Sequence, residues 1–258
     1  MISASAGRLA VGEGPAARDI AVLHRPGSAP GLFWLGGFTS DMTGSKATAV
    51  DAFAAGQGLA ATRFDYSGHG VSGGDFAEGT ITRWLEETRA VFDRFADGRQ
   101  VVVGSSMGGW IALRLAEMLR ESGRIAGLVL IAPAVDMTRA LMWDRWKKKA
   151  RDTLMTTGIY REPSAYSDEP YVITRALIED GDNHLFGGRL IDVGCPVTIL
   201  QGVADKEVPW RHAAALVERL ASDDVVLTLV KDGDHRLSRP EDLDRLTAAV
   251  AALVAEAG

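Results

Sequence analysis

One serine has the flanking residues that a nucleophilic serine requires. Residues 104–108 have the sequence GSSMG, a G-x-S-x-G pattern centred on Ser106. In this pattern a sharp turn between a strand and a helix exposes the hydroxyl, and small flanking residues permit the turn. An apolar run at 101–103 precedes the motif and an amphipathic segment at 107–121 follows it. This context favours Ser106 as a nucleophile over the alternative, a glycine-rich turn without chemistry.

A serine hydroxyl is a weak nucleophile and needs a base that takes its proton. Of the five histidines, His235 has the most suitable position, because it lies in a polar loop just after the apolar run at 225–230. Loops that follow parallel strands meet at the edge of the sheet where ligands bind. We therefore predict His235 as the base. His24 and His212 are interpreted as surface or packing residues, and His184 as a solvated side chain or a substrate contact.

The base needs a carboxylate that fixes its tautomer and stabilises its charged form. Asp205 follows the apolar run at 197–201, again at the end of a predicted strand. Glu207 is interpreted as a solvated loop residue, and the two aspartates next to His235 are too close in sequence to orient its ring. The order Ser106, Asp205, His235 is the order expected of the α/β-hydrolase fold.

Acyl transfer also requires two N–H donors for the negative oxygen that develops in the transition state. The turn geometry predicts the backbone N–H of Met107 as one donor. The second is expected from the loop that begins at Gly36 and Gly37. We predict the N–H of Phe38 as this donor, with Gly37 permitting close approach and contacting the substrate. The alternative for this loop is an ordinary glycine turn.

Apolar runs that alternate with helical segments indicate the elements that position these residues. Strands in such an order form a mostly parallel, twisted sheet with helices on both faces. The sequence therefore predicts a single α/β domain with the α/β-hydrolase fold. The predicted strands lie near 9–11, 20–24, 32–35, 60–65, 101–103, 125–131, 197–201 and 225–230, and the predicted helices near 48–59, 81–95, 107–121, 210–220 and 241–255.

The alternation of strands and helices is interrupted at 136–188, which we predict to be a helical lid over the sheet. Within it, the segment 137–154 has the pattern of a helix with one apolar side. Met142, Trp143 and Trp146 either line a pocket for an acyl group or form the core of the lid itself, since their spacing fits both.

Composition restricts the partners that the chain is expected to have. The 258 residues are 47% hydrophobic and carry a net charge of −6, and no basic run stands out beyond the short KKK at 147–149, which argues against nucleic acid as a partner. The single cysteine, Cys195, precedes a buried strand and is interpreted as a structural thiol. No pattern indicates a metal site, a signal peptide or a membrane span, so a cytoplasmic monomer or small homo-oligomer is expected.

Four strings resemble one group within the α/β-hydrolase superfamily, the acyl-protein thioesterases and acyl-glucuronide esterases. They are GFTSDMTGSKA at 37–47, FDYSG at 64–68, VGSSMGGW at 103–110 and VPW at 208–210. The segment 63–72 also resembles the R-x-D-x-x-G-x-G-x-S loop of many α/β-hydrolases, in which Asp65 and His69 are structural. The resemblance extends from about residue 31 to the C-terminus. It implies hydrolysis of a carboxylic ester or thioester through an acyl-enzyme, without metal or organic cofactor.

Two other functions are compatible with the same residues. A carbon–carbon bond hydrolase or an amidase on this fold would use the same three side chains, so that only substrate profiling separates them from an esterase. A catalytically silent ligand-binding protein is the second alternative. Such proteins usually lack one of the three residues, and all three are present here.

Overall fold

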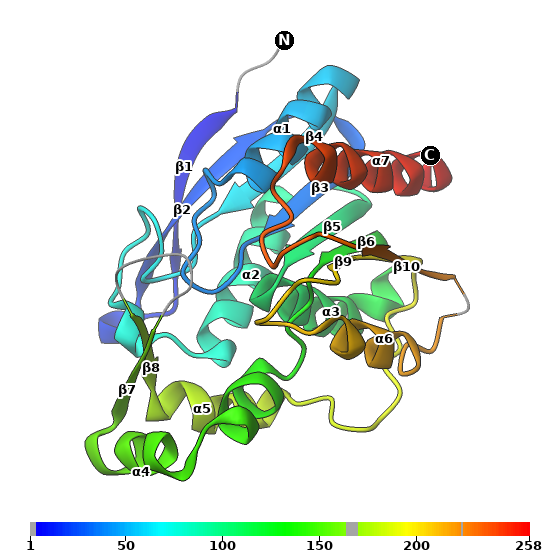
Figure 1. Cartoon of the computed structure of the whole chain (residues 1–258). Helices are drawn as coiled ribbons and strands as arrows, with labels where there is room; N and C mark the ends of the chain where they lie inside the picture. The colour runs from blue at the N-terminus through cyan, green and yellow to red at the C-terminus, as the bar shows by residue number, and fades with distance from the viewer. Residues whose placement is uncertain (1–3, 164–169, 223) are drawn as a thin grey trace.

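A single eight-stranded sheet forms the centre of the computed structural model, which describes residues 4–163, 170–222 and 224–258 (Figure 1). In spatial order the strands of this sheet are β1 (Ser5–Val11), β2 (Arg18–Arg25), β4 (Leu59–Phe64), β3 (Ser28–Leu35), β5 (Gln100–Ser105), β6 (Ile125–Ile131), β9 (Val197–Gly202) and β10 (Val225–Val230). In this order, the neighbours from β4 onward run parallel, whereas β1 with β2 and β2 with β4 pair antiparallel.

Helices cover both faces of this sheet. Two of them pack on one face, α1 (Ser45–Gln57) and α7 (Pro240–Ala257). Three pack on the other face, α2 (Ile81–Phe95), α3 (Met107–Leu119) and α6 (Trp210–Val217). This three-layer arrangement agrees with the fold class that the sequence predicts. Short 3-10 turns lie at Gly14–Ala16, Phe76–Glu78 and Arg120–Ser122.

The central strands are apolar on both sides because each face of the sheet is covered. In β5, Val101 and Val103 pack with α1 and α7, whereas Val102 between them packs with α2 and α3. All three are completely buried. Side chains alternate between the faces of a strand, so an uninterrupted apolar run is the pattern of a strand buried on both sides. This burial fixes the strand ends that carry the candidate site.

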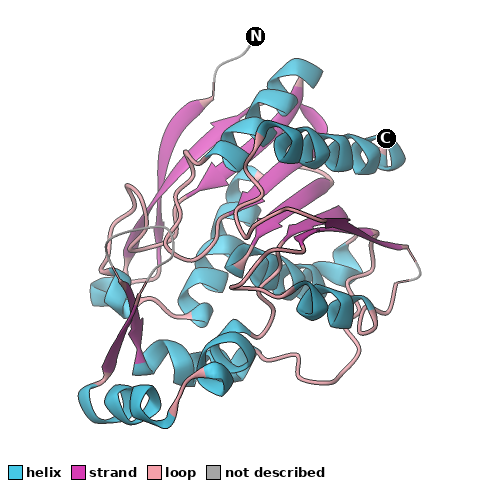
Figure 2. Cartoon of the chain, viewed as in Figure 1, coloured by secondary structure: helices cyan, strands magenta, loops and turns pink. Residues whose placement is uncertain are grey.

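The segment between β6 and β9 departs from the alternation of strands and helices (Figure 2). Its elements are a π-helix at Met137–Met142, 3-10 turns at Trp143–Arg145 and Asp182–His184, the helices α4 (Lys148–Thr157) and α5 (Arg175–Gly181), and the antiparallel pair β7 (Ile159–Glu162) and β8 (Tyr171–Thr174). Residues 164–169 of the expected lid lie outside the described residues.

The expected helix over 137–154 is wrong in one respect. The helical backbone ends at Trp146, which is extended with φ −72° and ψ 143°, and α4 starts two residues later. The Trp146 side chain is buried, and its Nε1–H donates to Glu162 Oε1 at 3.0 Å. Tertiary contacts of one tryptophan therefore outweigh the helical pattern of the surrounding residues. The pair β7–β8 was also not predicted.

Candidate active site

Ser106 lies in the sharp turn between β5 and α3. Its φ of 54° and ψ of −117° place a non-glycine residue in a strained region of backbone space. The turn requires glycine beside it, because a Cβ atom at Gly108 would lie 2.2 Å from the carbonyl oxygen of Leu35. The backbone of this turn is held by Ser106 N–H, which donates to Ile131 O at 2.8 Å.

The structure brings together the three side chains that the sequence selects. His235 follows β10 and Asp205 follows β9, and both lie at the carboxyl edge of the sheet with Ser106. The Nδ1 atom of His235 lies 2.8 Å from Asp205 Oδ2, and its Nε2 atom lies 3.1 Å from Ser106 Oγ. With Nδ1 as the protonated nitrogen, the lone pair of Nε2 faces the serine hydroxyl. This is the geometry that general-base activation of a serine requires.

Asp205 is held rigidly in a fully buried position. Its Oδ1 atom accepts two backbone hydrogen bonds, from Glu207 N–H and Val208 N–H at 2.9 Å each. Its Oδ2 atom accepts a further bond from Gln201 Nε2 at 3.2 Å. A buried carboxylate is tolerated only when such donors replace its lost water. The carboxylate is therefore fixed in the orientation that meets the His235 ring.

The loop after β3 approaches Ser106 closely. A Cβ atom at Gly37 would lie 3.3 Å from both Ser106 Cβ and Ser105 O, so that glycine permits the close approach. Gly37 and Phe38 line the same cavity as Ser106 and His235. Met107 begins α3, so its N–H belongs to the first helical turn, where backbone N–H groups have no intrahelical acceptor. Both predicted oxyanion donors therefore belong to residues near the serine, since Met107 follows it directly and Phe38 lines the same cavity.

A second carboxyl group, which the sequence analysis did not assign to the site, also faces the imidazole. Glu207 Oε2 lies 3.4 Å from His235 Nε2, and about a third of its side chain is exposed. Burial raises the pKa of Glu207, while the nearby His235 opposes this rise. Our interpretation of Glu207 as a solvated loop residue is therefore incomplete, because the partly exposed side chain also contacts the predicted base. Its position two residues after Asp205 places it near the site, but the sequence does not show which way its side chain turns.

The site opens into a cavity of about 710 Å³. The segment between β6 and β9 provides apolar wall residues, among them Met137, Leu141, Met142 and Trp146. The same segment is fastened to the loop that carries Asp205. The Arg145 guanidinium group donates to the carbonyl oxygens of Glu207 at 2.6 Å and Lys206 at 3.1 Å.

The predicted substrate contacts separate into two groups. Gly37, Met142 and Trp146 line the cavity, whereas Trp143 is not among its described lining residues. The guanidinium groups of Arg139 and Arg151 lie 5.7 and 5.4 Å from the centre of the Trp143 ring. These cation–π contacts keep the ring on the segment between β6 and β9 itself.

His184 has neither of the two expected environments. Its Nε2 atom lies 2.6 Å from Thr82 Oγ1, whose hydroxyl donates to Asp180 Oδ1 at 2.7 Å. The expectation of a solvated side chain or a substrate contact is therefore replaced by a structural contact of His184, in the segment between β6 and β9, with α2.

The part of the chain that the structure describes contains neither a candidate metal site nor a candidate membrane span. No group of three or more His, Cys, Asp and Glu side chains there could hold a metal ion. No helix in the same ranges has the length and apolar character needed to cross a membrane.

Comparisons with known proteins agree with the fold. The model of the alpha/beta hydrolase family matches residues 21–249. The human mitochondrial palmitoyl-protein thioesterase ABHD10 is 32% identical over 237 residues, which are 92% of this chain and 76% of that protein. The structure of mouse alpha/beta hydrolase domain-containing protein 10 has a TM-score of 0.89 and 31% identity, covering 98% of this chain and all of the other.

A presumed hydrolase from Agrobacterium vitis S4 is more similar in structure. Its crystal structure has a TM-score of 0.94 and 51% identity, covering 97% of this chain and 99% of the other. The match of the family model to most of the chain, together with these relatives, confirms the resemblance drawn from the four sequence strings. The chain is a hydrolase and belongs to the alpha/beta hydrolase family.

Proposed function

We propose that this hydrolase cleaves carboxylic esters or thioesters through an acyl-enzyme formed on Ser106. One observation carries the proposal: the His235 ring lies between the Asp205 carboxylate at 2.8 Å and the Ser106 hydroxyl at 3.1 Å. These contacts give each of the three residues a chemical role. Asp205 fixes the tautomer, His235 is the base, and Ser106 is the nucleophile.

In the acylation step, His235 Nε2 takes the hydroxyl proton while Ser106 Oγ attacks the acyl carbonyl carbon. The N–H groups of Met107 and Phe38 stabilise the negative oxygen of the tetrahedral intermediate. The imidazolium then gives its proton to the leaving oxygen or sulfur, and the bond from that atom to the carbonyl carbon breaks. An alcohol or thiol departs, and the acyl group remains on Ser106.

In the deacylation step, His235 takes a proton from water, which attacks the acyl carbon. The second tetrahedral intermediate collapses, the proton returns to Ser106 Oγ, and the carboxylic acid is released. Neither step calls for a metal ion or an organic cofactor.

The cavity and the relatives support an acyl substrate. About 710 Å³ of space lies beside Ser106, and part of its wall is apolar. Small-molecule sites combine such apolar walls with a few polar groups. The mammalian relatives are named palmitoyl-protein thioesterases. We further propose that the segment between β6 and β9 acts as a lid whose residues Met142 and Trp146 contact the acyl chain.

A fluorophosphonate probe tests the nucleophile, and a panel of p-nitrophenyl esters and acyl-thioesters tests the reaction. We expect labelling of the wild-type protein at Ser106, no labelling of Ser106→Ala, and turnover of esters or thioesters. Labelling together with turnover of only amides or carbon–carbon substrates would replace the proposed substrate class. Absence of both labelling and turnover would indicate a ligand-binding protein.

The compartment and the oligomeric state stay predictions. The mammalian relatives are named mitochondrial, whereas we expect this chain in the cytoplasm as a monomer or small homo-oligomer. Cell fractionation tests the first expectation, and light scattering of the purified protein tests the second.

A further inference from the structure

The loop that carries the proposed donor Phe38 contains a residue in an unfavourable backbone conformation. Ser40 N–H donates to Gly37 O at 3.2 Å, which closes a four-residue turn with Phe38 and Thr39 at its centre. Thr39 has a φ of 60°. A left-handed φ at this position of a turn favours glycine, and it is rare for a β-branched residue. Contacts from outside the turn must therefore stabilise this conformation.

His69 provides one such contact. The Thr39 N–H donates to His69 Nε2 at 3.2 Å, and His69 Nδ1 lies 3.2 Å from Ser67 O. Because an N–H group faces Nε2, this nitrogen carries the lone pair and Nδ1 carries the proton, which it donates to Ser67 O. Only the neutral imidazole makes both bonds. Burial lowers the pKa of His69 to about 4, so the ring is neutral near pH 7.

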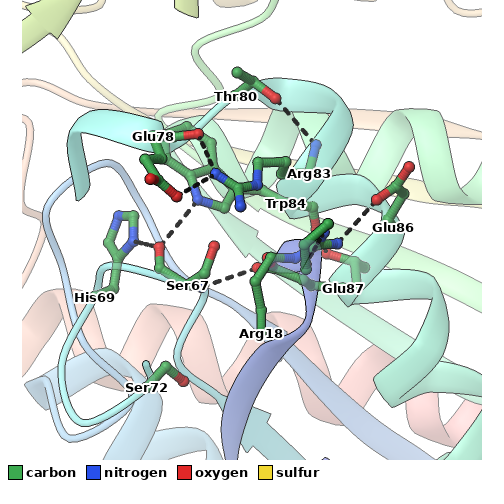
Figure 3. A network of polar contacts seen from close by, with 12 residues as sticks. Arg18, Ser67, His69, Ser72, Glu78, Thr80, Arg83, Trp84, Glu86 and Glu87 are labelled. Carbon is green, nitrogen blue, oxygen red and sulfur yellow. Dashed lines mark hydrogen bonds and ion pairs between the residues drawn. The ribbon is translucent and has the colours of Figure 1, made fainter. Parts of the chain in front are cut away.

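A buried polar network holds His69 from behind (Figure 3). Ser67 N–H donates to Glu87 Oε2 at 2.9 Å, and the other oxygen of this fully buried carboxylate accepts from Arg18 Nε at 2.8 Å. The Trp84 Nε1–H donates to Ser67 O at 3.3 Å, so this carbonyl oxygen faces both Trp84 and His69. The network fixes the position and orientation of the imidazole relative to Thr39.

Three aromatic rings also pack around the His69 ring. The rings of Tyr66, Phe76 and Trp84 lie with their centres 5.6, 5.0 and 5.3 Å from it. The side chain of Phe38 packs against two of the same rings, Phe76 at 5.0 Å and Trp84 at 6.1 Å. His69 and Phe38 thus share one aromatic cluster, and the turn is fixed through both its backbone and its side chain.

Asp65 holds the far end of the same loop. Its Oδ1 accepts from Met42 N–H at 2.6 Å, and its Oδ2 accepts from Val71 N–H at 2.9 Å. This second attachment lies three residues after Thr39. Within the turn, the Ser40 hydroxyl also donates to Gly37 O at 2.8 Å, and His69 accepts the Thr39 N–H.

We propose that His69 is a positioning residue of the active site: its neutral imidazole holds the Thr39 N–H and thereby keeps Phe38 oriented as an oxyanion donor. The inference rests on the proposed function, because it needs an oxyanion at Ser106. Without an acceptor for its N–H, the peptide between Phe38 and Thr39 would turn toward the conformation that a β-branched residue favours. The loop of Asp65 and His69 then does more than the structural role expected from its sequence.

Three variants separate this role from packing. His69→Phe keeps an aromatic ring but removes the acceptor, whereas His69→Gln removes the ring but offers an amide oxygen near the position of Nε2. Thr39→Gly removes the unfavourable conformation, so that the turn no longer needs His69. His24→Phe serves as the matched control, because this half-buried histidine lies on β2 and packs against Phe95.

The measured quantities are kcat, KM and the inhibition constant of an acyl trifluoromethyl ketone, which forms an oxyanion at Ser106. We expect His69→Phe to lower kcat about 10²-fold with a nearly unchanged KM, and to weaken the inhibitor by a similar factor, as the loss of one oxyanion donor does. His69→Gln should recover at least part of the loss. In the Thr39→Gly background, the effect of His69→Phe should fall to a few-fold.

Other outcomes would overturn the proposal in distinguishable ways. A folded His69→Phe protein with wild-type kcat removes the positioning role and leaves the proposed function intact. If His69→Phe lowers kcat by the same factor with and without Thr39→Gly, His69 has a packing role only. If the wild-type protein hydrolyses no ester or thioester, the proposed function fails. Amide exchange of residues 37–42 then still decides whether His69 holds the turn, because exchange should be faster in His69→Phe than in His24→Phe.

Discussion

The Glu207 carboxyl group lies 3.4 Å from His235 Nε2, the same ring nitrogen that faces Ser106 Oγ. The imidazole therefore has a carboxyl group near each of its nitrogens, since Asp205 meets Nδ1. An ionised Glu207 stabilises the imidazolium that forms when His235 takes the serine proton, which helps the transition state. Two neighbours, Asp205 and Glu162, add to the rise in the pKa of Glu207, and Arg145 opposes it.

Replacing Glu207 by glutamine is expected to lower kcat moderately. The carboxylate stabilises the imidazolium that forms when His235 takes the serine proton, so its removal raises the free energy of the transition state. Because the side chain is partly exposed, the loss should be about fivefold or less. Steady-state assays with p-nitrophenyl acetate measure it. Glu218→Gln, an exposed carboxylate elsewhere, is the control, and equal kcat values for both variants would contradict the prediction.

Substitutions of the three proposed catalytic residues should lower activity to different extents. Ser106→Ala and His235→Ala should each lower kcat by about 10⁶-fold, because the two side chains act as one unit. Asp205→Asn should cost about 10⁴-fold, since the serine and the base stay in place but the tautomer is wrong. Steady-state assays with a p-nitrophenyl ester measure these losses.

Ser105→Ala is the matched control for the nucleophile, because Ser105 ends β5 and is buried beside Ser106. It should retain most of the activity. An inactive Ser105→Ala protein together with an active Ser106→Ala protein would reverse the assignment.

The lid should set the preference for acyl length through the residues that line the cavity. Met142→Ala should lower kcat/KM for octanoyl esters more than for acetyl esters, whereas Trp143→Ala should leave the ratio unchanged. Each methylene that loses its contact costs about 0.8 kcal/mol, which corresponds to up to roughly fourfold in rate. The ratio of kcat/KM for the two esters measures the effect. A changed ratio in Trp143→Ala alone would show that Trp143, and not Met142, contacts the acyl chain.

His69 should make the folded protein less stable in acid. Its pKa is about 4 in the folded state against an ordinary value of 6.5. Between these values the unfolded chain binds the proton and the folded chain does not, so stability falls as the pH drops from about 6.5 to about 4. His69 contributes up to about 3 kcal/mol to this loss in the free energy of unfolding.

Urea unfolding of wild-type protein and His69→Gln at pH 7, 5.5 and 4.5 isolates this share. The difference between the two proteins should narrow as the pH falls, because the variant has no group to protonate at this position. Parallel losses of stability in both proteins would show that other groups account for the effect of acid.

The sequence predicts the sheet and the positions of the proposed catalytic residues because both depend on local patterns. Buried strands are short apolar runs, and Ser106, Asp205 and His235 each follow one of them. The cavity walls depend on tertiary contacts instead. Trp143 and Trp146 are equally apolar and three residues apart, yet only the second lines the cavity, because the chain leaves its helical path between them. Glu207 was missed for a related reason, since sequence does not show which way a loop side chain turns.

The two hydrogen bonds from Arg145 to the backbone of Lys206 and Glu207 have a consequence for protein engineering. They join the segment between β6 and β9 to the loop on which Asp205 stands. A lid transplanted from another hydrolase would leave those two carbonyl oxygens without their guanidinium partner unless it brought an arginine to the same place. Chimeras that exchange residues 205–209 together with the lid should therefore retain turnover better than chimeras that exchange the lid alone.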